Sequence, residues 1–227
     1  MISKLPKWIW AGAWALAFVA GFVNVIGLLG FQHQAVTHLT GTASLLAEAM
    51  SDLQSDSILH FAAVLGSFVF GCVVSGFIVE DSTLRLGRRY GVALLMESVL
   101  FAAAVPLLDR NNIWGIYLTS CACGLQNAMV STYSGSVVRT THLSGMFTDL
   151  GIFLGHWLRG IRVDARRVRL CGTVISAFIC GGVAGTWGFH LLKYHALFIP
   201  AALSTLAAAG YAAYRFLKRS PVDRSGA

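Results

Sequence analysis

Charged residues are scarce in this sequence. Only 12% of its 227 residues are Asp, Glu, Lys or Arg, whereas 56% are hydrophobic. A water-soluble domain usually carries about 25% charged residues. The shortage of charge therefore excludes a water-soluble globular domain as the fold class.

Cysteines are also few and lie in apolar surroundings, so they do not form a disulfide framework. All five cysteines lie in or at the ends of hydrophobic blocks, where a small buried side chain is the usual role: Cys72, Cys121, Cys123, Cys171 and Cys180. The sequence lacks two His residues at helical spacing beside a Glu, a pattern typical of zinc enzymes. We therefore expect neither a metal site nor a cofactor.

Long apolar runs dominate the chain instead. Six blocks are mostly hydrophobic, namely Trp8–Gly30, Ile58–Val79, Gly91–Leu108, Ile113–Tyr133, Leu170–Leu192 and Ala196–Leu217. Each has roughly the 17–25 residues that are needed to cross a hydrocarbon core of about 30 Å. Backbone groups in lipid must be satisfied within their own segment. The blocks therefore predict an all-α membrane protein of one domain with six transmembrane helices.

Basic residues gather in four places beside these blocks. They come before the first block, after the second, before the fifth and after the sixth. Because cytoplasmic loops are enriched in Lys and Arg, six spans place all four clusters and both termini in the cytoplasm, with residues 218–227 as a short tail. The net charge of +7 then reflects topology and contact with the lipid bilayer, and it argues against nucleic acid as a partner.

The two halves of the chain resemble each other in sequence. Residues 21–24 (GFVN) match residues 124–127 (GLQN). The polar string THLTG at residues 37–41 matches THLSG at residues 141–145. A polar string of this kind rarely recurs by chance at a matched place, so the match predicts an internal repeat.

We place the first repeat at residues 8–108 and the second at residues 113–217. Their second spans, Ile58–Val79 and Leu170–Leu192, align at an offset of 109, for example Ser67 with Ser176. Each repeat contains three spans, which is an odd number, so the second repeat enters the membrane from the opposite face. This is the inverted-repeat plan of many secondary transporters.

The repeated polar strings lie in two shorter segments, Gln32–Met50 and Arg139–Leu158. If the first were a full span, the basic loop after the second block would face outward, against the positive-inside pattern. We therefore expect one re-entrant loop with a half-helix in each repeat, entering from opposite sides. Their ends are expected to meet at one site in the middle of the membrane.

The chain resembles the YoaK family of bacterial multi-span inner-membrane proteins, whose function is unknown. The resemblance extends from about Trp10 to Leu217 and rests on Gly21–Gly41, on the GLQN string and on Tyr133–Gly151. It implies a multi-pass protein of the bacterial inner membrane and says little about a substrate. One departure is Asn24, where the resemblance leads us to expect an acidic residue.

Intramembrane polar residues are costly, so they are the first candidates for function. The starts of the two half-helices suit an anion, because helix N-termini present free N–H groups, although simple capping is the alternative interpretation. The equivalent histidines either relay protons or hold the loop by hydrogen bonds to the backbone. The predicted substrate-binding residues are Asn24, His38, Thr40, Gly41, Asn127, Arg139, His142, Ser144 and Gly145.

Two carboxylates are candidates for coupling transport to protons. Glu97 is a lone acidic residue in the third apolar block, and Asp149 lies about one turn after Ser144 in the second half-helix. A structural role for Asp149 is the alternative, because a helix N-terminus favours a negative charge. An ion pair between Asp149 and Arg139 is a further alternative.

The leading hypothesis is a small secondary transporter that moves a small molecule or ion, with an anion as one class of solute. A channel would fit the same features. The enzyme alternative is an intramembrane enzyme that uses His38, His142 and Asp149, with assistance by a metal ion as one form of it. We expect no enzyme activity, and a homo-oligomer is compatible with the sequence.

Overall fold

The computed structural model describes residues 7–30, 39–79, 89–134 and 141–218. All regular secondary structure in this part of the chain is helical. The elements are α1 (Lys7–Leu29), α2 (Leu39–Ser51), α3 (Ser55–Ile78), α4 (Tyr90–Asp109), α5 (Trp114–Ser134), α6 (Leu143–Leu158), α7 (Ala165–Leu192), the 3-10 helix η2 (Lys193–Leu197) and α8 (Phe198–Lys218). An α helix is thus present in each of the six apolar blocks and in each of the two shorter segments, as predicted.

Glycines bring the central helices into direct contact. In the pair α1–α7, a Cβ at Gly21 would overlap the backbone of Phe178, and a Cβ at Gly181 would overlap the backbone of Phe18. Only glycine lets two helix backbones approach this closely, as in the small-residue interfaces of membrane helices. The glycines at these positions are therefore required for packing.

The pair α3–α5 has the same construction. Gly124 meets the backbone of Phe68, and Gly71 meets the backbone of Cys121. Two cross-links add to the contact: the Ser120 hydroxyl donates to the carbonyl of residue 64, and the Cys72 thiol donates to that of Gly124. Each of these two helix pairs therefore joins one helix of the first half to one helix of the second half.

The contacts correspond between the two pairs at fixed offsets. Gly21 and Gly124 are 103 positions apart, whereas Gly71 and Gly181 are 110 positions apart. The predicted offset of 109 between α3 and α7, the second spans of the two halves, is therefore wrong by one residue. The alignment of Ser67 with Ser176 was drawn on residue type, whereas the backbone contacts depend on which face of the helix carries the glycine.

Helix α4 packs against α5 and α8 and completes the bundle. Its contact with α8 contains a polar pair, in which the hydroxyls of Ser98 and Thr205 are 2.7 Å apart. The Ser98 hydroxyl also lies 2.7 Å from the carbonyl oxygen of Ala201. Polar groups buried between helices are stable when they are hydrogen-bonded in this way.

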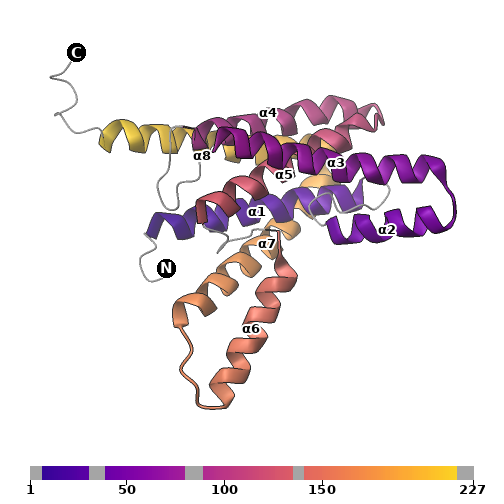
Figure 1. Cartoon of the computed structure of the whole chain (residues 1–227). Coiled ribbons are helices and arrows are strands. Elements are labelled where there is room, and N and C mark those ends of the chain that lie inside the picture. The colour runs from indigo at the N-terminus through magenta and orange to yellow at the C-terminus, as the bar shows by residue number, and fades with distance from the viewer. Residues whose placement is uncertain (1–6, 31–38, 80–88, 135–140, 219–227) are drawn as a thin grey trace.

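Figure 1 shows two helical hairpins that project from the bundle. Helix α2 folds back on the first part of α3, and α6 folds back on the first part of α7. The figure also places the start of α1 and the end of α8 at the same end of the bundle. The short helices are thus held mainly by their hairpin partners.

Four segments of the described residues are long and apolar enough to cross a membrane: Trp10–Leu29, Ser55–Ile78, Tyr90–Asp109 and Ala165–Tyr214, the last of which covers α7 and α8. Helix α5 is not among these described segments, because it carries several polar residues. Three of them, Thr119, Ser120 and Gln126, are buried and donate to backbone carbonyls. Polar residues of this kind face the interior of a membrane bundle.

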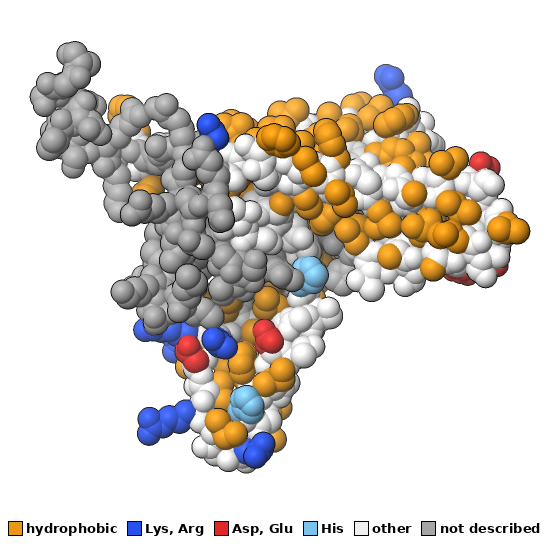
Figure 2. All heavy atoms as spheres, viewed as in Figure 1, with side chains coloured by type: hydrophobic (Ala, Val, Ile, Leu, Met, Phe, Trp, Pro, Cys, Tyr) orange, Lys and Arg blue, Asp and Glu red, His pale blue; other side chains and the backbone are white. Residues whose placement is uncertain are grey.

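The outer surface of the bundle is strongly apolar. Phe77 of α3 is 84% exposed and Leu191 of α7 is 82% exposed, and many other large hydrophobic side chains are also on the surface. Figure 2 shows such side chains spread over one face of the bundle, with charged groups near the tips of the projections. Apolar patches of this extent suit a lipid environment. The protein is therefore a helical membrane protein.

Candidate functional site

The predicted half-helix starts lie on the surface of their hairpins. Thr40 and Gly41 are exposed in the first turn of α2, and Ser144 and Gly145 are exposed in the first turn of α6. The two turns are alike, since the Ser44 hydroxyl donates to the Thr40 carbonyl at 3.0 Å and the equivalent Thr148 hydroxyl donates to the Ser144 carbonyl at 2.9 Å.

These two short helices do not come together. Helix α2 packs on α3, helix α6 packs on α7, and the described residues of α2 and α6 make no contact with each other. The prediction that they meet at one central site is therefore wrong for the described part of the chain. The physical reason is that a short amphipathic helix buries its apolar face equally well on the helix that follows it in a hairpin.

Other predicted substrate-binding residues are found at the roots of the hairpins. Asn127 of α5 accepts a hydrogen bond from the Thr141 hydroxyl at 3.0 Å, which ties the start of the α6 segment to α5. Asn24, the equivalent residue of α1, is buried. His142 is exposed directly before α6, whereas His38, Arg139 and the tail after residue 218 lie outside the described residues.

Asp149 is exposed on α6. Among the described residues, no three His, Cys, Asp or Glu side chains converge in a way that would hold a metal ion. The set proposed for a metal-assisted enzyme includes His38, which lies outside the described residues. The ion pair of Asp149 with Arg139 likewise involves a residue outside them.

The most unusual side chain in the interior is Glu97. Its exposed fraction is 0%, and it lies in α4 opposite Ser204 of α8, which is 1% exposed. The Ser204 hydroxyl is close enough to interact with the carboxyl, but neither group makes a hydrogen bond of normal geometry within the described residues. A buried polar group without a partner is costly, so it needs a functional explanation.

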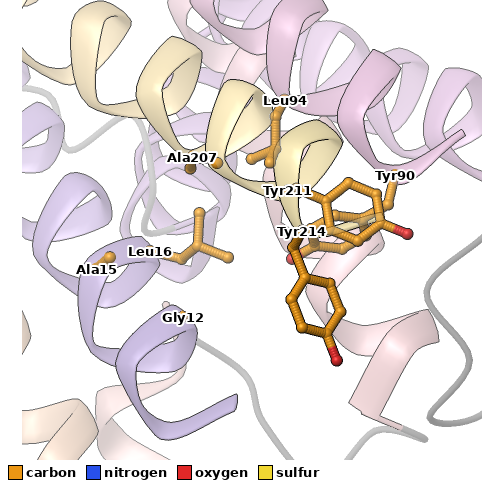
Figure 3. Close-up of a pocket in the computed structure, with 9 residues that line it drawn as sticks. Gly12, Ala15, Leu16, Tyr90, Leu94, Ala207, Tyr211 and Tyr214 are labelled. Carbon is orange, nitrogen blue, oxygen red and sulfur yellow. The ribbon is translucent and has the colours of Figure 1, made fainter. Parts of the chain in front are cut away.

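A cavity opens near Glu97 between α1, α4 and α8. Its volume is about 260 Å³. Figure 3 shows Gly12, Ala15 and Leu16 of α1 on one side of the cavity and three tyrosines of α4 and α8 on the other. The lining is Gly12, Ala15, Leu16, Tyr90, Leu94, Ala207, Gly210, Tyr211 and Tyr214.

Residues that line the cavity share a helix face with Glu97 in α4 and with Ser204 in α8. In α4, Glu97 follows Tyr90 and Leu94 at helical spacing, and in α8, Ser204 precedes Ala207 and Tyr211 at helical spacing. Residues three and four positions apart share a helix face. Glu97 and Ser204 therefore lie about one turn deeper in the bundle than the floor of the cavity.

The opposite end of the bundle is closed at the matching position. Gly115 of α5 is the equivalent of Gly12 at the offset of 103. A Cβ at Gly115 would meet the Leu108 side chain at 2.6 Å and the Ala104 carbonyl oxygen at 3.1 Å, whereas a Cβ at Gly12 would meet nothing within 4 Å among the described residues. The two ends therefore share a design but differ in packing.

Sequence reasoning identified Glu97 but missed the cavity. Tyr90 and Tyr211 come from helices far apart in the chain, and their rings pack edge to face with centroids 5.7 Å apart. A tyrosine near the end of a span is common at membrane interfaces. No signal in the sequence separated these tyrosines from interfacial ones.

Comparison with known proteins identifies a family for this chain. A family model described as a protein of unknown function (DUF1275) matches residues 12–210, which includes both ends of the bundle and Glu97. No curated protein and no solved structure matches the chain. The resemblance to YoaK proteins stays a prediction. The chain belongs to the DUF1275 family of proteins of unknown function.

Proposed function

We propose that the protein is a small secondary carrier in the inner membrane of a bacterium. In this proposal two inverted repeats, α1–α4 and α5–α8, form six spans with both termini in the cytoplasm. A small solute passes along α1, α4, α5 and α8 rather than between the two short helices. Glu97 couples this movement to protons.

The repeated contacts support the inverted repeat. The glycine contacts of α1–α7 recur in α3–α5 with the helices exchanged between the two halves. The hydroxyl–carbonyl bonds of α2 and α6 recur at an offset of 104. Such exchange is expected when a pseudo-two-fold axis in the membrane plane relates two repeats.

The contact between α4 and α8 supports a central position for Glu97. Ser98 bonds to Thr205, and Glu97 lies against Ser204, so both pairs are 107 positions apart. Helices α4 and α8 are the last helices of the two proposed repeats and pack on each other. Corresponding helices of two repeats contact each other only near the axis that relates the repeats. In such a carrier the axis lies near the middle of the membrane, where substrate and coupling-ion sites are usually found.

The unequal packing at Gly12 and Gly115 carries the proposal. Alternating access requires that one of two related ends is open while the other is closed. The end at Gly12 has a cavity, and the end at Gly115 is filled by Leu108. We interpret this arrangement as an inward-open state, because Gly12 lies at the end that carries both termini.

Glu97 would carry the proton in this cycle. A carboxyl group at this depth is stable when protonated, and it releases its proton only when water reaches it. Closing the cavity at Gly12 and opening the end at Gly115 would move the access of water from one side to the other. The carboxyl would thereby exchange protons with each compartment in turn.

The test uses access to single cysteines and requires no knowledge of the solute. In a chain with its five native cysteines replaced, Gly12→Cys and Gly115→Cys are labelled with a membrane-impermeant maleimide in whole cells and in inverted vesicles. A carrier predicts fast labelling of Gly12→Cys from the cytoplasmic side and slower labelling of Gly115→Cys from the opposite side.

Flux measurements provide a second test of the proposed carrier. Flux of labelled small solutes into proteoliposomes should depend on a proton gradient in the wild type and lose that dependence in Glu97→Gln. Complete protection of Gly115→Cys under all conditions, together with no flux of any solute from a folded preparation, would reject the carrier.

A further inference from the structure

We propose that the tip of the hairpin formed by α6 and α7 binds anionic phospholipid headgroups at the membrane surface. The tip comprises residues 157–169, which are the end of α6, the connecting loop and the start of α7. This inference goes beyond the proposed carrier and does not depend on it. It depends on the charge of the tip, on its exposed apolar side chains and on the contrast with the hairpin of α2 and α3.

Positive charge is concentrated at this tip. Its basic residues are all exposed, namely Arg159, Arg162, Arg166, Arg167 and Arg169. Among the described residues, four of them (Arg159, Arg162, Arg167 and Arg169) take part in no ion pair. Figure 2 shows Lys and Arg side chains on this projection. The guanidinium groups are thus accessible to an anion, and their planar fork of N–H donors matches a phosphate group.

The acidic residue of the tip does not cancel this charge. Asp164 is the single Asp or Glu among residues 157–169, so that the five arginines leave a formal charge of +4. Its carboxylate caps α7 by accepting a hydrogen bond from the backbone N–H of Arg166 at 2.9 Å. Asp149, the other acidic residue of the hairpin, lies about two turns before the tip. The tip therefore has a strong preference for anions.

Large apolar side chains are exposed beside these arginines. Trp157 is 67% exposed, Leu158 is 72% exposed, and Ile161 in the loop is also exposed. A small soluble anion would leave these side chains in water. At a bilayer surface, Trp and Leu side chains can enter the boundary between headgroups and acyl chains while arginines reach the phosphates. The combination favours a lipid surface as the partner.

The backbone of the tip keeps the apolar and basic groups together. The N–H of Ile161 donates to the carbonyl of His156 at 2.9 Å, and the N–H of Gly160 donates to that of Trp157 at 3.0 Å. Gly160 has a φ of 72°, a left-handed conformation that is common where a helix ends. The chain therefore turns sharply after α6 and presents both kinds of side chain at the same end of the hairpin.

The hairpin of α2 and α3 has the opposite charge. Residues 39–79 contain no Lys or Arg, and three acidic residues, Glu48, Asp52 and Asp56, lie at or near the turn between its helices. Figure 2 shows acidic side chains near the tip of that projection. Leu53 in the turn is exposed, so both tips carry apolar surface. An anionic membrane surface should therefore attract the tip of α6 and α7 and repel the tip of α2 and α3.

A fluorescent dye placed at either tip tests the proposal. In the full chain with its five native cysteines replaced, Ala165→Cys at the start of α7 or Ser55→Cys at the start of α3 is labelled with nitrobenzoxadiazole, which brightens when it leaves water. Both positions are exposed, and they correspond at the offset of 110. The labelled chain is reconstituted in phosphatidylcholine nanodiscs with increasing fractions of phosphatidylglycerol.

The two labelled positions should respond differently. We expect phosphatidylglycerol to raise the fluorescence at Ala165→Cys at least about twofold, because the tip then enters the interface. The fluorescence at Ser55→Cys should stay constant. High salt should reduce the rise at Ala165→Cys, because it screens the attraction between arginines and headgroups.

Matched substitutions in the labelled Ala165→Cys chain identify the binding groups. Arg162→Gln should raise the phosphatidylglycerol fraction needed for half of the response by about three- to fivefold, whereas Arg162→Lys keeps the charge and should change it much less. Arg110→Gln, which removes an exposed arginine at the end of α4, should have no effect. Trp157→Ala keeps every arginine and should lower the maximal rise.

Several results would overturn the proposal. An equal rise at Ser55→Cys would mean that the lipid does not act at this tip. An unchanged response after Arg159, Arg162 and Arg167 are all replaced by Gln would reject the arginines, and an unchanged response in Trp157→Ala would reject insertion into the interface. If a single-stranded RNA gives the same rise in pure phosphatidylcholine nanodiscs, the surface binds polyanions in general and the assignment to lipid fails.

Discussion

The two ends of the bundle are packed differently. At one end, Gly12 of α1 faces a cavity bordered by Tyr211 of α8. At the other end, Gly115 of α5 touches Leu108 of α4, and no gap separates the helices at that point. In the proposed carrier, these two ends represent the open and the closed arrangement of one repeated unit. The difference shows that a glycine in this position of the bundle can face a cavity, as Gly12 does, or a packed side chain, as Gly115 does.

Locking the closed end should have the largest effect on this comparison. In a background without native cysteines, Leu108→Cys with Gly115→Cys should form a disulfide, because the Leu108 side chain lies against the Gly115 position. In the proposed carrier, flux should then stop completely and return after reduction. The control pair, Gly12→Cys with Tyr211→Cys, faces across the cavity and should form little disulfide. Undiminished flux in the locked protein would show that the closed end never opens.

Removing the buried carboxyl should have the next largest effect. Glu97→Gln keeps the size of the side chain and removes its ability to carry a proton, so uptake driven by a proton gradient should fall by roughly tenfold or more. Exchange of solute without a gradient should persist. Asp149→Asn, which changes an exposed carboxylate on α6, serves as the control and should leave both rates near those of the wild type. Equal losses of proton-driven uptake in both variants would contradict a specific role of Glu97 in carrying the proton.

The same substitution at both ends compares how tightly each end is packed, through its effect on the free energy of unfolding. Gly115→Val should lower the free energy of unfolding by about 1–3 kcal/mol, because the added methyl groups overlap Leu108. Gly12→Val adds the same atoms to open space and should stay within about 0.5 kcal/mol of the wild type. Thermal unfolding in detergent measures both. A similar loss in the two variants would mean that the two ends are packed alike.

The smallest effect is expected from an ion pair at the closed end. His195 of η2 and Asp109 of α4 approach to 3.4 Å, with both side chains partly exposed to solvent. Exposed pairs of this kind contribute about 0–1 kcal/mol, so Asp109→Asn should change the melting temperature little. It should nevertheless raise the labelling rate of Gly115→Cys by a few fold. An unchanged labelling rate would exclude this pair as a latch.

Much of the fold follows from local properties of the sequence. Apolar blocks of the right length predict helices, and the small residues near Gly71 and Gly181 predict the faces on which helices pack closely. Glu97 was also predictable, because an ionisable residue in an apolar block is rare. These signals lie within single segments of the chain.

The partners of the segments could not be predicted in the same way. The THLTG and THLSG strings predict two short helices, but their sequence does not say whether α2 packs on α6 or on α3. The cavity likewise depends on Tyr90 and Tyr211, which meet only after α4 and α8 have packed. Tertiary contacts between distant segments determine both features, and a single sequence contains no direct record of such contacts.

The exchange of helices between the two halves has a consequence for any attempt to divide the chain. Because α1 pairs with α7 and α3 pairs with α5, a cut in the loop near Asn111 leaves each fragment without the partner of its innermost glycine. Neither fragment should fold alone. Co-expressed fragments should assemble, because α1 can then pack on α7 and α3 on α5. Each half of the chain thus supplies helix faces that the other half covers.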